Sequence, residues 1–128
     1  MAGDVLLDTN IVIAFFGNDA GVVMQLQQVN FLVPSIVLGE LYAGARKSGR
    51  VNENLARIDA MIRPDIVLSC DAATAWSYGV IKQALRLKGQ PIPENDLWIA
   101  SIALQHGLTL ITRDAHFGAV DGISLEAW

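Results

Sequence analysis

Short apolar runs alternate with longer segments of helical periodicity along the 128-residue chain. The apolar runs have the length and character of strands that are buried on both faces. They predict strands at residues 5–7, 31–33, 66–68 and 109–112, with an edge strand at 123–125. The segments between them follow residues that cap helices, and they predict helices at residues 11–16, 18–28, 35–45, 52–62, 72–88 and 95–106.

The alternation of strands and helices predicts an α/β fold. We expect a three-layer α/β/α arrangement with a short, mostly parallel central sheet whose crossovers are right-handed. Ser35, Asn52 and Asp71 are expected to cap the helices that they precede. The length is that of one domain, so we expect residues 1–128 to fold as a single domain. In open sheets of this kind, functional groups gather beyond the carboxyl ends of the strands.

Composition narrows the class of function. Nine Lys and Arg against thirteen Asp and Glu give a net charge of −4 and a pI near 4.9, which argues against a nucleic-acid binder that works through bulk positive charge. Apolar residues make up 52% of the chain, which excludes intrinsic disorder and leaves an apolar surplus for interfaces.

The longest apolar run, residues 11–16, is too short to span a membrane. Cys70 has no partner for an intrachain disulfide and residues 1–4 lack a basic signal region, so we expect a cytoplasmic protein.

Four carboxylates stand at positions that a hydrophobic core does not explain. Asp8 and Asp114 directly follow predicted strands, where a turn or helix-cap role is an equally good explanation. Glu40 and Asp96 lie on the apolar stripes of predicted helices. A carboxylate on such a stripe is costly to bury unless it is paired, hydrogen-bonded or bound to a cation.

If the four carboxylates converge, their repulsion requires a counter-charge, and hard oxygen ligands favour Mg²⁺ or Mn²⁺. Asn10 and Thr112 each lie two residues from an aspartate and either orient the carboxylates or serve as ordinary turn residues. A metal held by carboxylates suits phosphodiester hydrolysis, although the spacing alone does not identify the reaction. His106, His116 and Glu94 are interpreted as helix-end or surface residues rather than as ligands.

Four segments, in order and spacing, resemble those of PIN-domain ribonucleases, and within that family the VapC-type toxins of bacterial toxin–antitoxin pairs. They are residues 6–10 (LLDTN), 38–45 (LGELYAGA), 95–101 (NDLWIAS) and 112–117 (TRDAHF). The resemblance implies a Mg²⁺- or Mn²⁺-dependent endoribonuclease with an acidic quartet, supported by Asn10 and Thr112. The quartet consists of Asp8, Glu40, Asp96 and Asp114.

The resemblance also implies a homodimer that is inhibited by a small antitoxin, whose tail enters the active-site groove. The chain departs from many relatives in the proline-rich residues 91–95. Two alternatives stay open within the family: a nuclease of RNA processing and an inactive PIN-like binding module. A phospho-acceptor receiver domain is disfavoured because Asp8 stands alone after the first strand, and a dehalogenase-type phosphatase would need an Asp where Asn10 stands.

Seven of the nine basic residues fall in two windows, residues 46–57 and 82–88. In the second window, Lys82 and Arg86 share a helix face with Tyr78. Such a face suits contact with a phosphate backbone and base stacking, although an ordinary solvated face is the alternative explanation. Specificity for one RNA cannot be read from spacing. The residues that we expect to bind substrate are Arg46, Lys47, Lys82, Arg86 and Arg113.

Overall fold

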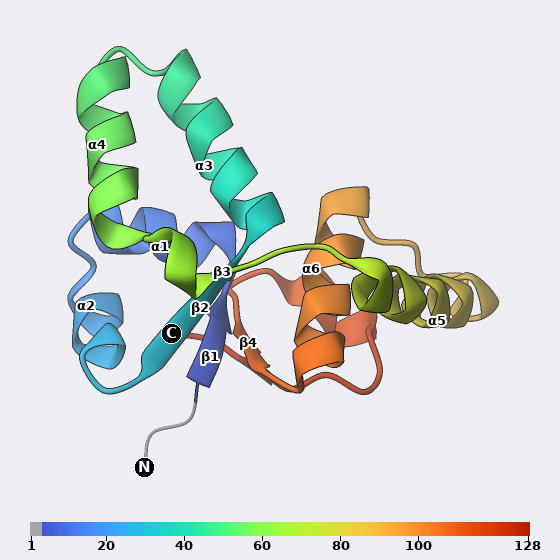
Figure 1. The fold of residues 1–128 in the computed structure, drawn as a ribbon. Helices are drawn as coiled ribbons and strands as arrows, with labels where there is room; N and C mark the ends of the chain where they lie inside the picture. The colour runs from blue at the N-terminus through green and yellow to red at the C-terminus, as the bar shows by residue number, and fades with distance from the viewer. Residues whose placement is uncertain (1–3) are drawn as a thin grey trace.

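The computed structural model describes residues 4–128 and shows a five-stranded parallel sheet with helices on both sides (Figure 1). The strand order is β3-β2-β1-β4-β5. Two short 3₁₀ helices are labelled η. The elements in chain order are β1 (Asp4–Leu7), α1 (Thr9–Phe16), α2 (Ala20–Leu26), β2 (Asn30–Pro34), α3 (Ser35–Lys47), α4 (Val51–Met61), η1 (Pro64–Ile66), β3 (Val67–Leu68), α5 (Ala72–Lys88), α6 (Glu94–His106), β4 (Thr109–Ile111), η2 (Ala115–Ala119) and β5 (Leu125–Glu126).

The sheet is built around β1, which pairs with a parallel strand on each side. Val5 lies opposite Phe31 of β2 and opposite Thr109 of β4. The outer pairs, β2 with β3 and β4 with β5, are also parallel. Helices α1 and α2 lie on one side of the sheet and α5 and α6 on the other (Figure 1). The predicted three-layer α/β/α fold with a parallel sheet is therefore confirmed.

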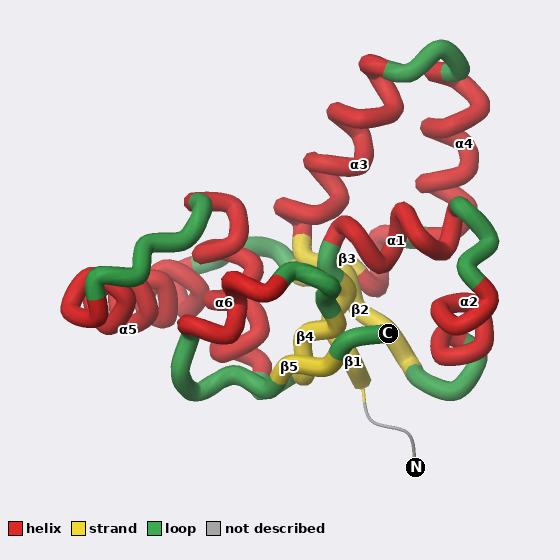
Figure 2. The backbone as a smooth tube through the Cα atoms, turned by 180° about the vertical axis from the view of Figure 1, so that it is seen from behind, coloured by secondary structure: helices red, strands yellow, loops and turns green. Residues whose placement is uncertain are grey.

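The strands are short and apolar because both of their faces are covered. Leu6, Leu7, Val33, Leu110 and Ile111 have no exposed side-chain surface. Successive residues of a strand point to opposite faces, so a strand between two helix layers needs apolar residues at every position. Helices α3 and α4 pack on each other as a hairpin that projects beyond the sheet (Figures 1 and 2).

Several helix starts differ from the prediction. Ser35 does not cap α3 but lies inside it, and Pro34 occupies the cap position with φ −65°. The cap of α6 is likewise a proline, so this helix begins at residue 94 rather than 95. The proline ring holds φ near the value that a helix start tolerates, without any side-chain hydrogen bond. Asn52 is not a cap either, because α4 begins at residue 51.

The predicted cap of α5 is confirmed. Asp71 accepts a hydrogen bond from the backbone N–H of Thr74, and the Thr74 hydroxyl accepts one from the backbone of Asp71. Such a capping box satisfies two backbone donors at once. Two strand predictions were too long or displaced: Ile66 belongs to η1, and the edge strand lies at residues 125–126. Within residues 4–128, no helix is both long and apolar enough to cross a membrane.

Phe117 fixes η2, the segment that follows β4, to the core. Its side chain is one of the largest of the fully buried side chains. The same short helix carries Asp114 at its N-terminal cap and His116 in its last turn. The burial of one aromatic ring therefore determines where these two polar side chains lie.

We expect Phe117→Ala to lower the free energy of unfolding by about 3–5 kcal/mol, because it removes a buried ring and leaves a cavity. Chemical denaturation followed by circular dichroism measures the change. Gly118→Ala is the matched control, since an added Cβ there meets no atom within 4 Å. Equal stability of the two variants would contradict the anchoring role of Phe117.

Candidate metal centre

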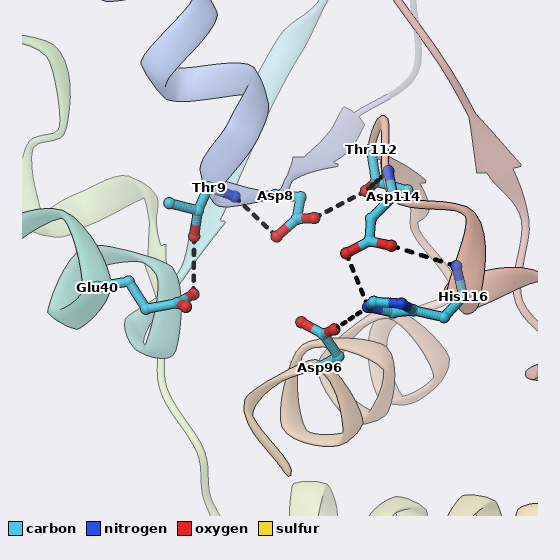
Figure 3. Close-up of polar contacts among 7 residues, drawn as sticks. All are labelled: Asp8, Thr9, Glu40, Asp96, Thr112, Asp114 and His116. Carbon is cyan, nitrogen blue, oxygen red and sulfur yellow. Dashed lines mark hydrogen bonds and ion pairs between the residues drawn. The ribbon is translucent and has the colours of Figure 1, made fainter. Parts of the chain in front are cut away.

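Asp8 lies at the carboxyl end of β1, where its backbone N–H donates to the carbonyl oxygen of Ile111 at 3.0 Å. Its side chain is only 5% exposed. One carboxylate oxygen accepts a hydrogen bond from the backbone N–H of Thr9 at 2.8 Å and caps α1. The other accepts one from the hydroxyl of Thr112 at 2.7 Å, across the sheet on the end of β4 (Figure 3).

Glu40 approaches the same edge from α3. The hydroxyl of Thr9 donates to its Oε1 atom at 2.8 Å (Figure 3). Thr9 thus contacts both acids, with its backbone N–H on Asp8 and its hydroxyl on Glu40. The sequence interpretation did not assign a role to Thr9, because only the position of α3 above α1 brings Glu40 within reach.

Asp96 and Asp114 complete the group from a third direction. Asp96 lies in the first turn of α6, and Asp114 caps η2. The ring of His116 lies between them, with Nε2 at 2.7 Å from Oδ2 of each (Figure 3). His116 lies at a helix end and its side chain is 43% exposed, as expected, but no pattern in the sequence indicated its contacts with these two acids.

Thr112 and Asn10 differ in what they touch. The hydroxyl of Thr112 donates to Asp8 and accepts the backbone N–H of Asp114 at 3.0 Å, so it links two of the acids. The side-chain oxygen of Asn10 instead accepts the backbone N–H of Arg113 at 3.3 Å. Asn10 therefore holds the backbone beside Asp114 and not a carboxylate.

The electrostatics of the group are those of crowded carboxylates. Burial raises the pKa of Asp8 above its usual value, the hydrogen bonds from Thr112 and Thr9 lower it, and the charges of Asp96 and Glu40 raise it again. Burial likewise raises the pKa of Asp96, His116 lowers it, and the charges of Asp114 and Glu40 raise it. The four carboxylates thus lie close enough to repel one another, and a cation between them would relieve that repulsion.

The donor set fits a divalent cation. Asp96, Asp114 and His116 each offer one ligand atom, and these atoms lie within 4.8 Å of one another. Ligands at about 2.1 Å from an octahedral ion are about 3.0 Å apart when adjacent. Carboxylate oxygens and an imidazole nitrogen are both ligands of divalent cations.

The basic residues that we expected to bind substrate lie in different environments. Arg113 donates to Asp19 at 2.8 Å and to the carbonyl oxygen of Trp128 at 2.7 Å. Lys82 contacts Glu94 at 3.3 Å. Both of these side chains are already paired. Arg46, Lys47 and Arg86 are exposed and form no ion pair with any residue in the range 4–128.

Tyr78, a candidate for base stacking from the sequence, packs instead against another aromatic ring of the protein. Its ring stacks on Trp98 of α6 with the centroids 4.1 Å apart, and the Lys82 ammonium lies 5.5 Å from its centroid. Its hydroxyl is hydrogen-bonded to Glu94, the first residue of α6. This cluster ties α5 to the start of α6, the turn that carries Asp96.

A largely apolar cavity of about 250 Å³ lies beside Glu40. Glu40 lines one side of it, and the rest of its wall comes from α1, α3 and α4. Arg57 stands at this cavity, where it donates to the carbonyl oxygen of Phe16 at 2.7 Å. The cavity therefore provides an apolar surface next to one of the four acids.

Comparison with known proteins gives a consistent result. A family model for the PIN domain matches residues 5–123. The chain is 35% identical over 127 residues to the tRNA(fMet)-specific endonuclease VapC of Shigella flexneri, covering 96% of each chain. It is 33% identical, with the same coverage, to the ribonuclease VapC2 of Haemophilus influenzae strain Rd.

Solved structures show the same similarity in three dimensions. The VapBC2 complex of Rickettsia felis bound to promoter DNA contains a chain that superposes with a TM-score of 0.89 at 29% identity, covering 98% of both chains. DNA-bound VapBC from Salmonella typhimurium gives a TM-score of 0.88 at 32% identity, covering 100% of this chain and 99% of that one.

We expect Asp8→Asn to stabilise the protein at neutral pH. The native pKa of Asp8 lies above the ordinary value of 3.8, so stability from this group is present below 3.8 and is lost as the pH rises through the native pKa. Asparagine does not ionise, so the variant does not lose this stability at neutral pH. Thermal unfolding in EDTA at pH 7 should therefore show a midpoint a few degrees higher for Asp8→Asn than for the wild type.

Asp19→Asn is the control of opposite sign. Arg113 lowers the pKa of Asp19, so its contribution is present above 3.8 and is lost as the pH falls through the native pKa. This variant should lower the midpoint at pH 7, and the decrease should become smaller as the pH falls below 3.8. A lower midpoint for Asp8→Asn at pH 7 would contradict the interpretation.

Proposed function

The chain belongs to the PIN-domain family, among the VapC ribonucleases, and from this premise we propose that it is a metal-dependent endoribonuclease, the toxin of a type II toxin–antitoxin pair. The observation that carries the proposal is the meeting of four carboxylates from four segments at the carboxyl edge of the sheet. In the proposal, the whole chain, residues 1–128, is one nuclease domain.

Each member of the quartet has a proposed part. Asp8, Glu40, Asp96 and Asp114 are proposed to hold Mg²⁺ or Mn²⁺. When bound, the cation polarises the phosphoryl group and helps to deprotonate the attacking water. Thr112 keeps Asp8 oriented and Thr9 keeps Glu40 oriented through the hydrogen bonds described above.

RNA is proposed to approach along the exposed end of α3. Arg46 and Lys47 lie in the last turn of that helix, about two turns beyond Glu40, and are exposed. Arg86 lines a separate cavity of about 440 Å³ with Lys82, whose ammonium must leave Glu94 before it can bind phosphate. The pairing of Arg113 with Asp19 makes it a weaker candidate for phosphate contact than Arg46, Lys47 and Arg86, which form no ion pair with any residue in the range 4–128.

The proposed partners are a small antitoxin and a second copy of the chain. Relatives of the same size were solved as VapBC complexes. The apolar cavity beside Glu40 is a suitable place for an apolar antitoxin tail. Trp76, Val80 and Leu87 expose apolar side chains along α5 and offer surface for an interface. A cytoplasmic setting fits the single free cysteine, Cys70.

The nuclease activity is tested with purified, partner-free protein on total RNA. Cleavage is expected with Mg²⁺ or Mn²⁺, to stop in EDTA, and to fall on the order of 10²-fold or more in Asp96→Asn, because one charge at the cation site is lost. Asp65→Asn is the control, since Asp65 is exposed and pairs with Arg63 on η1. Cleavage that persists in both EDTA and Asp96→Asn would refute the proposal, and product mapping identifies the RNA.

The toxin role is tested in growing cells. Expression of the chain should arrest growth, and Asp96→Asn should abolish the arrest because the proposed active site is disabled. Co-expression of one small protein that co-purifies with the chain should restore growth. A catalytically active chain that leaves growth unchanged would instead indicate a nuclease of RNA processing.

A further inference from the structure

We propose that His116 is itself a ligand of the divalent cation and that its imidazole makes the site favour Mn²⁺ over Mg²⁺. This role rests on the proposed function, since it concerns the cation of the same site. His116 Nε2 lies 2.7 Å from Oδ2 of Asp96 and 2.7 Å from Oδ2 of Asp114. Figure 3 shows the ring directed into the space between the two carboxylates.

The two distances from His116 Nε2 are close to those between neighbouring ligands of one ion. Ligand atoms at right angles around an ion with bonds of about 2.1 Å are about 3.0 Å apart. Each distance from His116 Nε2 is within a few tenths of an ångström of that value. The ligand atoms of the three residues all lie within 4.8 Å of one another, so a small outward movement of His116 and a closer approach of the two carboxylates would bring them to bonding distance from one ion.

The backbone holds His116 in this position. Its N–H donates to Oδ1 of Asp114 at 3.3 Å, and the N–H of Asp114 donates to Thr112 at 3.0 Å. The next residue, Phe117, is fully buried and fixes η2. The ring is 43% exposed, so an ion can reach it from solvent.

The identity of the donor decides which ion binds better. Both ions accept carboxylate oxygens, but Mg²⁺ dehydrates reluctantly and keeps to oxygen ligands, whereas Mn²⁺, a transition-metal ion, accepts an imidazole nitrogen more readily than Mg²⁺ does. A site with one nitrogen among carboxylate oxygens therefore prefers Mn²⁺ over Mg²⁺ more strongly than a site made of oxygen ligands alone. The quartet alone, with four carboxylates, gives no such preference.

The chain offers an internal control, because it has two histidines. His106 ends α6, whereas Asp96 lies in its first turn. Ten residues of helix separate the two by about 15 Å. His106 therefore cannot supply a nitrogen ligand at the site of Asp96, and His116 is the source of any imidazole ligand there.

The competing explanation is that His116 acts as a positive counter-charge, which a bound cation expels from between Asp96 and Asp114. In that case the ring leaves when the ion enters. The two explanations differ in whether a nitrogen atom is bonded to the ion, which spectroscopy measures directly.

The experiment uses the full, tag-free chain loaded with Mn²⁺ in the absence of RNA. Pulsed electron paramagnetic resonance should show an imidazole ¹⁴N coupling in the wild type and in His106→Gln, and none in His116→Gln. Calorimetry should show that His116→Gln weakens Mn²⁺ binding about tenfold or more, with a change below about threefold for Mg²⁺. Unchanged circular dichroism confirms that the exposed substitution leaves the fold intact.

Absence of the coupling in the wild type would overturn the assignment and favour the counter-charge. Persistence of the coupling in His116→Gln would overturn the assignment because another nitrogen would then be the ligand. Equal loss of affinity for both ions would overturn the selectivity. These outcomes are separate from failure of the proposed function, which Asp96→Asn tests by RNA cleavage. Cleavage without the coupling would refute the role of His116 alone, and coupling without cleavage would refute the nuclease alone.

Discussion

The hydrogen bond from Thr112 to Asp8 is the contact on which the site depends. It joins residues 104 positions apart in the sequence. It forms because β1 and β4 are parallel neighbours, so that their carboxyl ends meet at one edge. The bond from the Asp8 N–H to the Ile111 carbonyl oxygen extends the same ladder by one residue. Once that register is set, Asp114 follows two residues later, and only Glu40 and Asp96 must be brought in by helices.

The crowded carboxylates of the site destabilise the folded protein, and the burial of the apolar core stabilises it. The strand residues beneath the site are buried and apolar; they are Leu6, Leu7, Leu110 and Ile111. Above them, burial and the charges of neighbouring carboxylates raise the pKa values of Asp8 and Asp96. The overall charge reflects the same concentration. Without the four quartet acids, nine acidic residues balance nine basic ones, since 13 − 4 = 9. The low pI thus marks a local cluster and not a uniformly acidic surface, and a cation at the cluster would leave the basic windows free to act on RNA.

Most of the fold and the four acids could be predicted because they follow from local patterns. Buried strands require apolar runs, and a polar residue directly after such a run lies at the functional edge of a parallel sheet. The contacts of Thr9 and His116 could not be predicted because their partners are distant in the sequence. Thr9 is hydrogen-bonded to Glu40, 31 residues away, and His116 contacts Asp96, 20 residues away. The pairing of Arg113 with Asp19 spans 94 residues, and no spacing rule indicates it. Helix starts at Pro34 and Pro93 were missed for another reason, because backbone geometry replaced a side-chain cap there.

The quartet is divided into two halves with different support. In the first half, Thr9 of α1 donates its backbone N–H to Asp8 and its hydroxyl to Glu40, so both acids accept hydrogen bonds from neutral donors. Asp96 and Asp114 share the ring of His116. Thr112 connects the halves, because its hydroxyl donates to Asp8 and accepts the N–H of Asp114. The elements of the two halves meet also where α3 packs on α6. A ligand that engages both halves therefore joins α1, α3, α6 and η2, which couples occupation of the site to the relative position of the helices that surround it.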